Sequence, residues 1–271
     1  MFFLGLSKGN LGQISEAIAT LEEAIQIAGR NGDRFWYPRM PNCIGWIYRE
    51  LHDFDAAQRH NDDGIDIARQ HHVLEAEANS LINRGIDCTR AGDYVCTDAA
   101  FKDVHDIFAR DAWFRWRYNI RLEAAMAEHW LRQNDLEKAR EHVDRLMATA
   151  TEHEVHKYIA VAHNLMARVS IKAGDLPAAE KHFDAALDEL RDYPVPLVEW
   201  RVHAGRARLK SKMGDTAGAE EAIARATEVI NFIAENVNDE KLRKTFLNAT
   251  RQQLEGWPSV ATPALDHTGV A

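Results

Sequence analysis

The amino-acid sequence predicts an all-α protein, a right-handed α-solenoid of about six helix-turn-helix repeats followed by a C-terminal capping helix. Two observations predict this fold. A turn motif returns at intervals of 40, 40, 42, 40 and 40 residues along the chain, and small residues recur around each turn at the three- and four-residue spacing of one helix face. Internal periods of roughly 20–50 residues are typical of solenoids and related arrays. No strand-like alternation competes with the helical spacing.

Two adjacent columns of residues mark the turn at the centre of each repeat. The first holds residues suited to the left-handed conformation that ends a helix, mostly Gly or Asn. Its members are Gly12, His52, Gly92, Asn134, Gly174 and Gly214. The second is mostly Asp, whose carboxylate accepts hydrogen bonds from the free backbone amides that begin a helix. Its members are Gln13, Asp53, Asp93, Asp135, Asp175 and Asp215. Each pair predicts the junction of a helical hairpin.

Small residues predict how the helices of these hairpins pack. One column lies in the first helix of each repeat and comprises Gly5, Gly45, Gly85, Ala127, Ala167 and Ala207. Another lies in the second helix and comprises Ala17, Ala57, Thr97, Ala139, Ala179 and Ala219. A glycine inside a helix costs up to about 1 kcal/mol relative to alanine, so its recurrence indicates that helices approach closely there. We expect most helices to have roughly 17–20 residues, a length of about 25–30 Å.

The two ends of the array depart from the repeat. We expect the solenoid over residues 1–236, with its first repeat truncated, because "MFFLGLSKGN" supplies about half of a first helix. Residues 237–257 are expected to form the capping helix that a terminal repeat needs, and residues 258–271 a disordered tail. The array should leave an open curved surface and an incomplete N-terminal edge. That edge would be buried by a partner or by an upstream part of a longer protein.

These columns resemble the tetratricopeptide repeat (TPR). The small residues at the eighth, twentieth and twenty-seventh places of that repeat match Gly45, Ala57 and Gly64, and match again in the last two repeats. The period is longer than the usual TPR period of about 34 residues. This longer period resembles that of the C-terminal TPR regions of large bacterial signalling ATPases, nucleotide cyclases and regulators. The resemblance implies a non-catalytic protein–protein interaction scaffold or sensor, with the first helices lining a concave groove.

The charge pattern indicates what such a groove would bind. The whole chain has 33 basic and 42 acidic residues, a formal net charge of −9, yet the first helices lean basic and the second helices acidic. Because Arg and Asn side chains can hold carboxylates, we expect an acidic peptide or partner segment. The groove places of the TPR family, carried over to this sequence, are Arg39, Asn42, Trp46, Arg49, Asn79, Arg90, Arg121, Arg132, Asn164, Arg168, Lys172, Arg201, Arg208 and Lys212. The alternative is that these cations only complement helix C-termini and pair with acids of the second helices.

A second function stays open: a self-associating regulatory or assembly module that acts through the incomplete N-terminal edge, without a dedicated peptide ligand. No motif of catalysis is present, neither a glycine-rich phosphate loop nor a nucleophile elbow nor a zinc-protease helix. We therefore expect no enzyme and no cofactor. His153, His156 and His163 could share a helix face as metal ligands, but we favour solvated histidines and expect no metal site.

Nucleic-acid and membrane partners are not expected. The run from Trp113 to Tyr118 interleaves aromatic residues with Arg, as in platforms that stack single-stranded nucleic acid, but the acidic total favours packing between repeats. No run approaches the roughly 18–20 apolar residues of a membrane span. Cys88 and Cys96 straddle a turn and could approach each other, yet we favour small buried residues in a reducing, cytoplasmic compartment. The expected partners are an acidic protein or peptide, an upstream signalling domain or a second copy of the chain.

Overall fold

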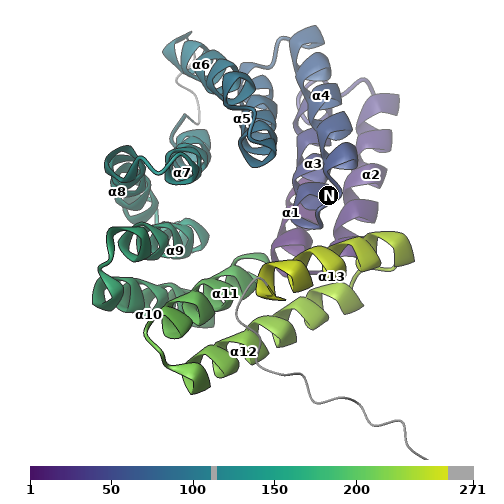
Figure 1. Cartoon of the computed structure of the whole chain (residues 1–271). Coiled ribbons are helices and arrows are strands. Elements are labelled where there is room, and N and C mark those ends of the chain that lie inside the picture. The colour runs from purple at the N-terminus through teal and green to yellow at the C-terminus, as the bar shows by residue number, and fades with distance from the viewer. Residues whose placement is uncertain (111–114, 256–271) are drawn as a thin grey trace, which may run out of the picture.

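The computed structural model describes residues 1–110 and 115–255. This part of the chain contains thirteen α-helices, a short 3-10 helix and no strand (Figure 1), so the predicted all-α helical repeat fold is confirmed. The helices are α1 (Phe2–Asn10), α2 (Ile14–Arg30), η1 (Tyr37–Arg39), α3 (Pro41–Glu50), α4 (Phe54–Gln70), α5 (Leu74–Ala91), α6 (Tyr94–Arg110), α7 (Arg115–Arg132), α8 (Leu136–Glu152), α9 (His156–Ala173), α10 (Leu176–Asp192), α11 (Pro196–Lys212), α12 (Thr216–Glu235) and α13 (Glu240–Glu255). None of them is long and apolar enough to cross a membrane.

The helices pair as six hairpins, each made of two successive helices from α1/α2 to α11/α12, and these pairs share most of the contacts between elements. From α4 to α12 the helices have 17 to 20 residues, as expected. The first helix of the second repeat is shorter, because Pro38 and Pro41 lack the N–H groups that a continuous helix needs. The chain there forms η1 and then the ten-residue α3.

The turn and cap columns have the predicted conformations. All six residues of the turn column have positive φ, from +63° at Asn134 to +84° at Gly174, and the non-glycine His52 has +64°. Each of the five Asp caps accepts a hydrogen bond from the backbone N–H three residues later, at 2.9 to 3.1 Å. Gln13 makes no such bond. The periodic sequence signal therefore reports the local geometry of every hairpin.

The glycine column of the first helices lies where neighbouring helices touch. A Cβ atom at Gly45 would lie 2.3 Å from Oδ1 of Asn61, and one at Gly85 would lie 2.3 Å from Cε1 of Phe101. Both distances are shorter than any normal van der Waals contact. At these two places the second helix of the hairpin occupies the volume that a larger residue would need, as the repetition of small residues predicts.

We expect Gly85→Ala to lower the free energy of unfolding by about 1–2 kcal/mol. Overpacking costs roughly 1–3 kcal/mol, and the better helix propensity of alanine offsets up to about 1 kcal/mol of it. Chemical denaturation measures the effect. Phe101→Leu supplies the control: in that background the same glycine substitution should cost less, since the ring that the new methyl group would strike is gone. An equal cost in both backgrounds would contradict the packing argument.

The array closes into a ring instead of staying open (Figure 1). One hydrophobic cluster joins residues of α2 and α3, such as Leu21 and Ile47, to Trp200 of α11, Ile233 of α12 and Phe246 of α13. Across the same seam, the backbone N–H of Ser15 donates to the carbonyl of Asn236 at 3.0 Å, and the N–H of Asn238 donates to the Ser15 hydroxyl at 2.7 Å. We call this junction the seam. The expectations of an open curved surface and of an uncovered N-terminal edge are therefore wrong.

The cysteines also differ from expectation. Cys88, in the last turn of α5, and Cys96, in the first turn of α6, form a disulfide with their Cα atoms 5.8 Å apart. The left-handed turn at Gly92 brings the two helix ends within reach of each other. Both residues are half-buried, so the preference for small buried residues is wrong for this pair. Cys43 is buried and unpaired.

Some expectations fall on parts of the chain outside the described residues. They are the tail at 258–271, the last two residues of the segment 237–257, and Trp113 and Phe114 of the aromatic run. Within the described part, α13 covers most of the expected capping segment and packs against α12 and the first two repeats.

Candidate functional site

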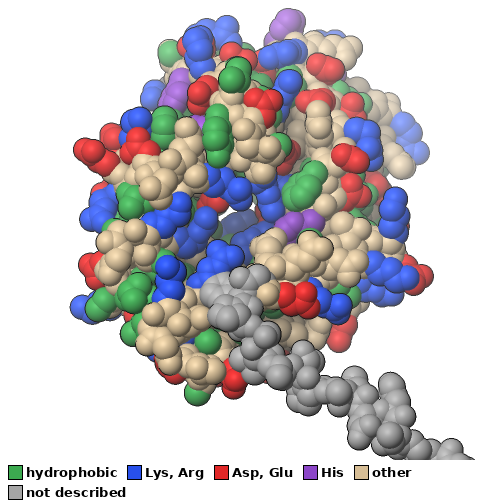
Figure 2. All heavy atoms as spheres, viewed as in Figure 1, with side chains coloured by type: hydrophobic (Ala, Val, Ile, Leu, Met, Phe, Trp, Pro, Cys, Tyr) green, Lys and Arg blue, Asp and Glu red, His purple; other side chains and the backbone are tan. Residues whose placement is uncertain are grey.

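A cavity of about 1140 Å³ lies at the centre of the ring, and we call it the lumen. Residues of α1, η1, α3, α5, α7, α9 and α11 line it, joined by Gln253 of α13. The lining therefore comes from the first helix of each repeat, while the second helices lie outside. In the space-filling view the face is hollowed at its centre, and Lys and Arg side chains gather around the hollow (Figure 2).

The lumen is basic although the chain as a whole is acidic. Among the described residues, ten Lys and Arg but only two Glu line it. The cations are Arg39, Arg49, Arg90, Arg117, Arg121, Arg132, Lys157, Arg168, Arg201 and Arg208, and the carboxylates are Glu50 and Glu128. A concave surface that carries charge of one sign between low-dielectric walls raises the local concentration of oppositely charged groups. The lumen should therefore attract anions.

Eleven of the fourteen expected groove residues line the lumen, and three do not. Asn42 is buried beneath α5, where its Oδ1 accepts a hydrogen bond from Nδ2 of Asn79 at 2.6 Å. Lys172 donates to the carbonyl of Leu131 at 2.9 Å, at the C-terminal end of α7. Lys212 is exposed at the end of α11. For Lys172 the contact is the one that the alternative interpretation describes, a cation that complements a helix C-terminus.

One lumen carboxylate, Glu128 of α7, is held by two arginines. Arg168 of α9 donates two hydrogen bonds to it, one to each oxygen, and Nε of Arg132 donates to Oε1 at 2.9 Å. Burial by itself would raise the pKa of Glu128, but the two guanidinium groups outweigh it and lower the pKa to about 2. Glu128 is thus ionised and already occupied by protein cations, so it neutralises part of this wall of the lumen.

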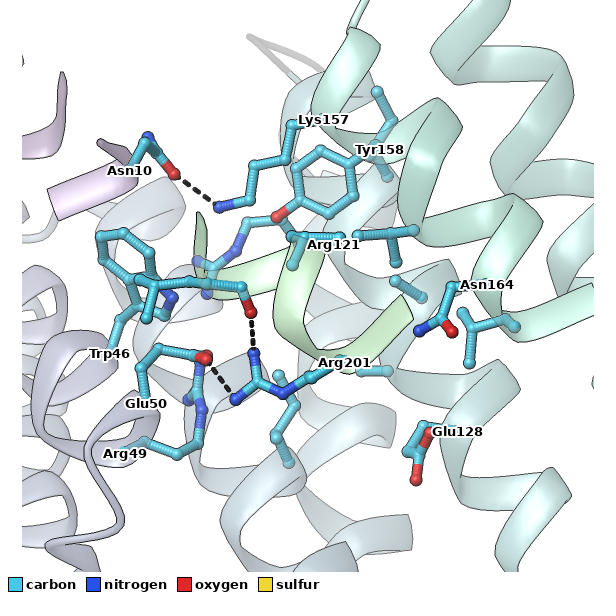
Figure 3. Close-up of a pocket in the computed structure, with 18 of the residues that line it drawn as sticks. Asn10, Trp46, Arg49, Glu50, Arg121, Glu128, Lys157, Tyr158, Asn164 and Arg201 are labelled. Carbon is cyan, nitrogen blue, oxygen red and sulfur yellow. Dashed lines mark hydrogen bonds and ion pairs between the residues drawn. The ribbon is translucent and has the colours of Figure 1, made fainter. Parts of the chain in front are cut away.

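The other carboxylate, Glu50 at the end of α3, lies across the seam from α11. Its Oε2 forms an ion pair with Arg201 at 2.6 Å, and Arg49 lies 3.9 Å from Oε1. Figure 3 shows Glu50 and Arg201 facing each other. Arg90 and Lys157 add to the positive potential at the carboxylate, so its pKa falls to about 2 although burial opposes ionisation. We call Glu50 together with Arg49, Arg90, Arg121, Lys157 and Arg201 the Glu50 cluster.

Three cations of this cluster have no carboxylate within ion-pair distance among the described residues. Arg121 donates to the Oδ1 of Asn83 at 2.6 Å, Lys157 donates to the Oδ1 of Asn10 at 2.8 Å, and Arg90 lies over the ring of Phe54. Burial lowers the pKa of Lys157. Burial, together with Arg201, lowers the pKa of Arg90 to about 10. The positive charge in this part of the lumen is therefore incompletely compensated by the protein.

The lumen also offers apolar walls and uncommitted polar atoms. Trp46 and Tyr158 face the lumen beside Lys157, whose ammonium lies 4.7 Å from the Trp46 ring centroid. Asn164 is 8% exposed, and its Oδ1 is buried with no hydrogen-bond partner in the described part of the chain. The Nε1 of Trp200 is also buried and lacks a partner there. Cavities that bind small ligands combine apolar lining with a few such polar groups.

Sequence reasoning missed several lining residues, among them Glu50, Lys157 and Trp200. Glu50 could have been predicted from the sequence, because it is an acidic residue directly after the expected groove residue Arg49. Lys157 lies in the first turn of α9, before the places that the family pattern carries over. Trp200 enters the lumen from α11 next to the seam, and no pattern within one repeat predicts a seam.

The histidines considered as metal ligands do not converge on one point. His153 stacks on Trp116, with ring centroids 4.0 Å apart, whereas His156 lies against Tyr193 and Glu189. His163 meets His182 through ring nitrogens 3.1 Å apart. Trp116, part of the aromatic run, lies in the lumen wall. Each ring therefore has its own neighbours in the part of the protein that the structure describes.

Residues 1–31 match the family model of the tetratricopeptide repeat. A search among curated proteins found no sequence that matches this chain. Together with the succession of helical hairpins, the family match supports a TPR protein, and TPR arrays are in general non-catalytic modules that bind other proteins.

Proposed function

We propose that this chain is a scaffold or sensor module that binds an acidic peptide or partner segment in its lumen, as part of a bacterial signalling or regulatory system. The observation that carries the proposal is the lining of the lumen, in which ten cations face two carboxylates. The TPR match supports protein–protein interaction in general. The signalling role rests on the resemblance to longer-period TPR arrays.

The wall formed by α9 and α11 fits an acidic segment. Arg168 and Arg208 come from neighbouring repeats, and Asn164 lies one helical turn before Arg168 on α9. Arg168 already holds Glu128 and adds positive charge to this wall, while the side-chain amide of Asn164 can bond to the backbone of a bound peptide. The apolar part of the lining would receive hydrophobic side chains between the acids.

The N-terminal edge no longer favours self-association as the main function. Part of that edge packs against α11, α12 and α13 within the same chain, whereas Phe3 and Leu4 of α1 stay more than half exposed. We therefore keep the acidic segment as the main proposal and self-association through this edge as the second candidate.

The test uses two short labelled peptides, one alternating Glu with Leu and one alternating Lys with Leu, in a fluorescence-anisotropy titration. The acidic peptide should bind and the basic one should not, and added salt should weaken the complex because the attraction is between charges. Arg208→Glu should weaken binding at least about tenfold, equivalent to 1.4 kcal/mol. Arg206→Glu is the matched control, since Arg206 lies on the same helix outside the lumen and pairs with Asp184. Equal binding of both peptides, or equal effects of the two variants, would contradict the proposal.

A further inference from the structure

The Glu50 cluster concentrates more positive charge than the protein neutralises. Its five cations come from five helices, α3, α5, α7, α9 and α11. Among the described residues, the carboxylates within ion-pair distance of these cations are Glu50 and Asp87. Five cations and two carboxylates leave an excess of three positive charges on one side of the lumen. Such an excess is costly in a partly desolvated site unless an anion joins it.

Shared partners show that Arg49, Arg121 and Arg201 form one patch, and Arg90 and Lys157 lie near enough to act electrostatically on the same Glu50 carboxylate. The Oδ1 of Asn83 accepts hydrogen bonds from both Arg49, at 3.0 Å, and Arg121, at 2.6 Å. Glu50 contacts both Arg49 and Arg201. The excess charge is therefore concentrated and not spread along a groove.

A compact anion suits this patch better than a peptide does. Acidic side chains on one face of an extended peptide are about 6.5–7 Å apart, because they come from every second residue. On a helix face they are about 5–6 Å apart. A diphosphate group carries a negative charge similar in size to the excess of three positive charges, and its oxygen atoms lie within a single small group. Guanidinium forks match the geometry of phosphate oxygens.

We infer that the Glu50 cluster is a binding site for a small phosphorylated organic molecule whose diphosphate group contacts Arg90, Arg121 and Lys157. The lumen is larger than a diphosphate group needs, and its volume of about 1140 Å³ lies slightly above the usual range for ligand cavities. The remaining space is bounded by the aromatic walls and by Asn164 and Trp200, whose unpartnered polar atoms can bond to the organic part. This inference goes beyond the proposed function and does not depend on it.

The site exists only while the ring is closed. Glu50 and Arg201 belong to helices that are neighbours only across the seam, and Lys157 reaches Asn10 of α1 from α9. A ligand that binds this arrangement and not an open array stabilises the closed ring by mass action. Diphosphate should therefore raise the midpoint of thermal unfolding in a concentration-dependent way.

The test is isothermal titration calorimetry of the full chain with inorganic diphosphate, orthophosphate and the Glu-Leu peptide. We expect diphosphate to bind at least about tenfold more tightly than orthophosphate, since it engages more of the excess charge. Diphosphate binding no tighter than orthophosphate, or no binding at all, would overturn the inference. If diphosphate does not bind and the acidic peptide does, the result contradicts this inference but not the proposed function. If the peptide does not bind and diphosphate does, the result contradicts the proposed function but not this inference.

Variants locate the site. Arg90→Gln and Lys157→Gln should each weaken diphosphate binding about tenfold, the loss of one charge-assisted contact. Lys157→Arg keeps the charge and should retain most of the affinity. Lys102→Gln is the control, because Lys102 is exposed and pairs with Asp106 outside the lumen. The two glutamine variants lie on different helices, so either one, shown to be folded by circular dichroism, decides the outcome. An effect of Lys102→Gln equal to theirs would show non-specific attraction and overturn the assignment.

Discussion

Glu50→Gln is expected to lower the free energy of unfolding by about 3 kcal/mol at neutral pH. Removing one member of a buried ion pair costs roughly 3–5 kcal/mol, because the partner charge stays behind without compensation. Here the side chain of Glu50 is 12% exposed and that of Arg201 is 29% exposed, which favours the lower end of the range. The cost should still be large for a partly exposed ion pair, because Arg49, Arg90 and Lys157 also act on this carboxylate. Urea denaturation measures it.

Glu240→Gln is the matched control for this prediction. Glu240 pairs with Lys244 at 2.6 Å, but both side chains are 68% exposed, so the same substitution should change stability by less than about 0.5 kcal/mol. The pKa of Glu50 in the folded protein is about 2, below its ordinary value of 4.5. Its contribution is therefore present above pH 4.5 and is lost as the pH falls towards 2. A Glu50→Gln protein as stable as the parent would show that the seam does not depend on this carboxylate.

The second large effect concerns pH and His52, which lies in the turn after α3 at the seam. His52 is 9% exposed and approaches Gln253 and Phe246 of α13. Burial, with help from Arg90 and Arg201, lowers its pKa from 6.5 to about 4. Between these values the unfolded chain binds a proton and the folded protein does not. Stability should therefore fall as the pH is lowered from 6.5 to 4, by roughly 3 kcal/mol for a shift of this size.

His52→Asn should remove this part of the pH dependence while keeping the turn. Asparagine tolerates a positive φ, and Asn134 occupies the equivalent turn in the fourth repeat. His72→Asn is the control, since His72 also has a positive φ but is not part of the seam. The measurement is urea denaturation of the three proteins at pH 6.5, 5 and 4. If the His52→Asn protein loses stability as steeply as the parent does, another group is responsible.

The hairpins could be predicted from the sequence because their signals are local. A left-handed turn residue, the Asp cap that follows it and a small residue where helices touch all act within about 20 residues of one another. Each of these requirements repeats, as Gly92 and Asp93 illustrate, so the columns are visible without any alignment. The resemblance to the TPR family implies that the first helices lie on the inner side, and eleven of the fourteen groove residues carried over from it line the lumen.

The ring could not be predicted in this way. Closure depends on the small rotation between successive hairpins, summed over the whole array, and no single repeat reveals that sum. Two consequences of closure were therefore missed. Glu50 meets Arg201 only across the seam, and the apolar face of α2 is covered by helices that come about 200 residues later. Lys172 was predicted in the groove because it occupies a groove place carried over from the TPR family, whereas its side chain reaches the carbonyl of Leu131.

Closure of the ring also affects how the protein unfolds and how it folds. Open repeat arrays gain stability from nearest neighbours and begin to fray at their two ends, where one neighbour is missing. Here each hairpin has a neighbour on both sides, so loss of any one of them exposes two others and unfolding should become more cooperative. During synthesis, the hydrophobic face of α2 stays exposed until α11, α12 and α13 have been made, because these helices cover it in the folded protein. Until then it is an aggregation-prone surface.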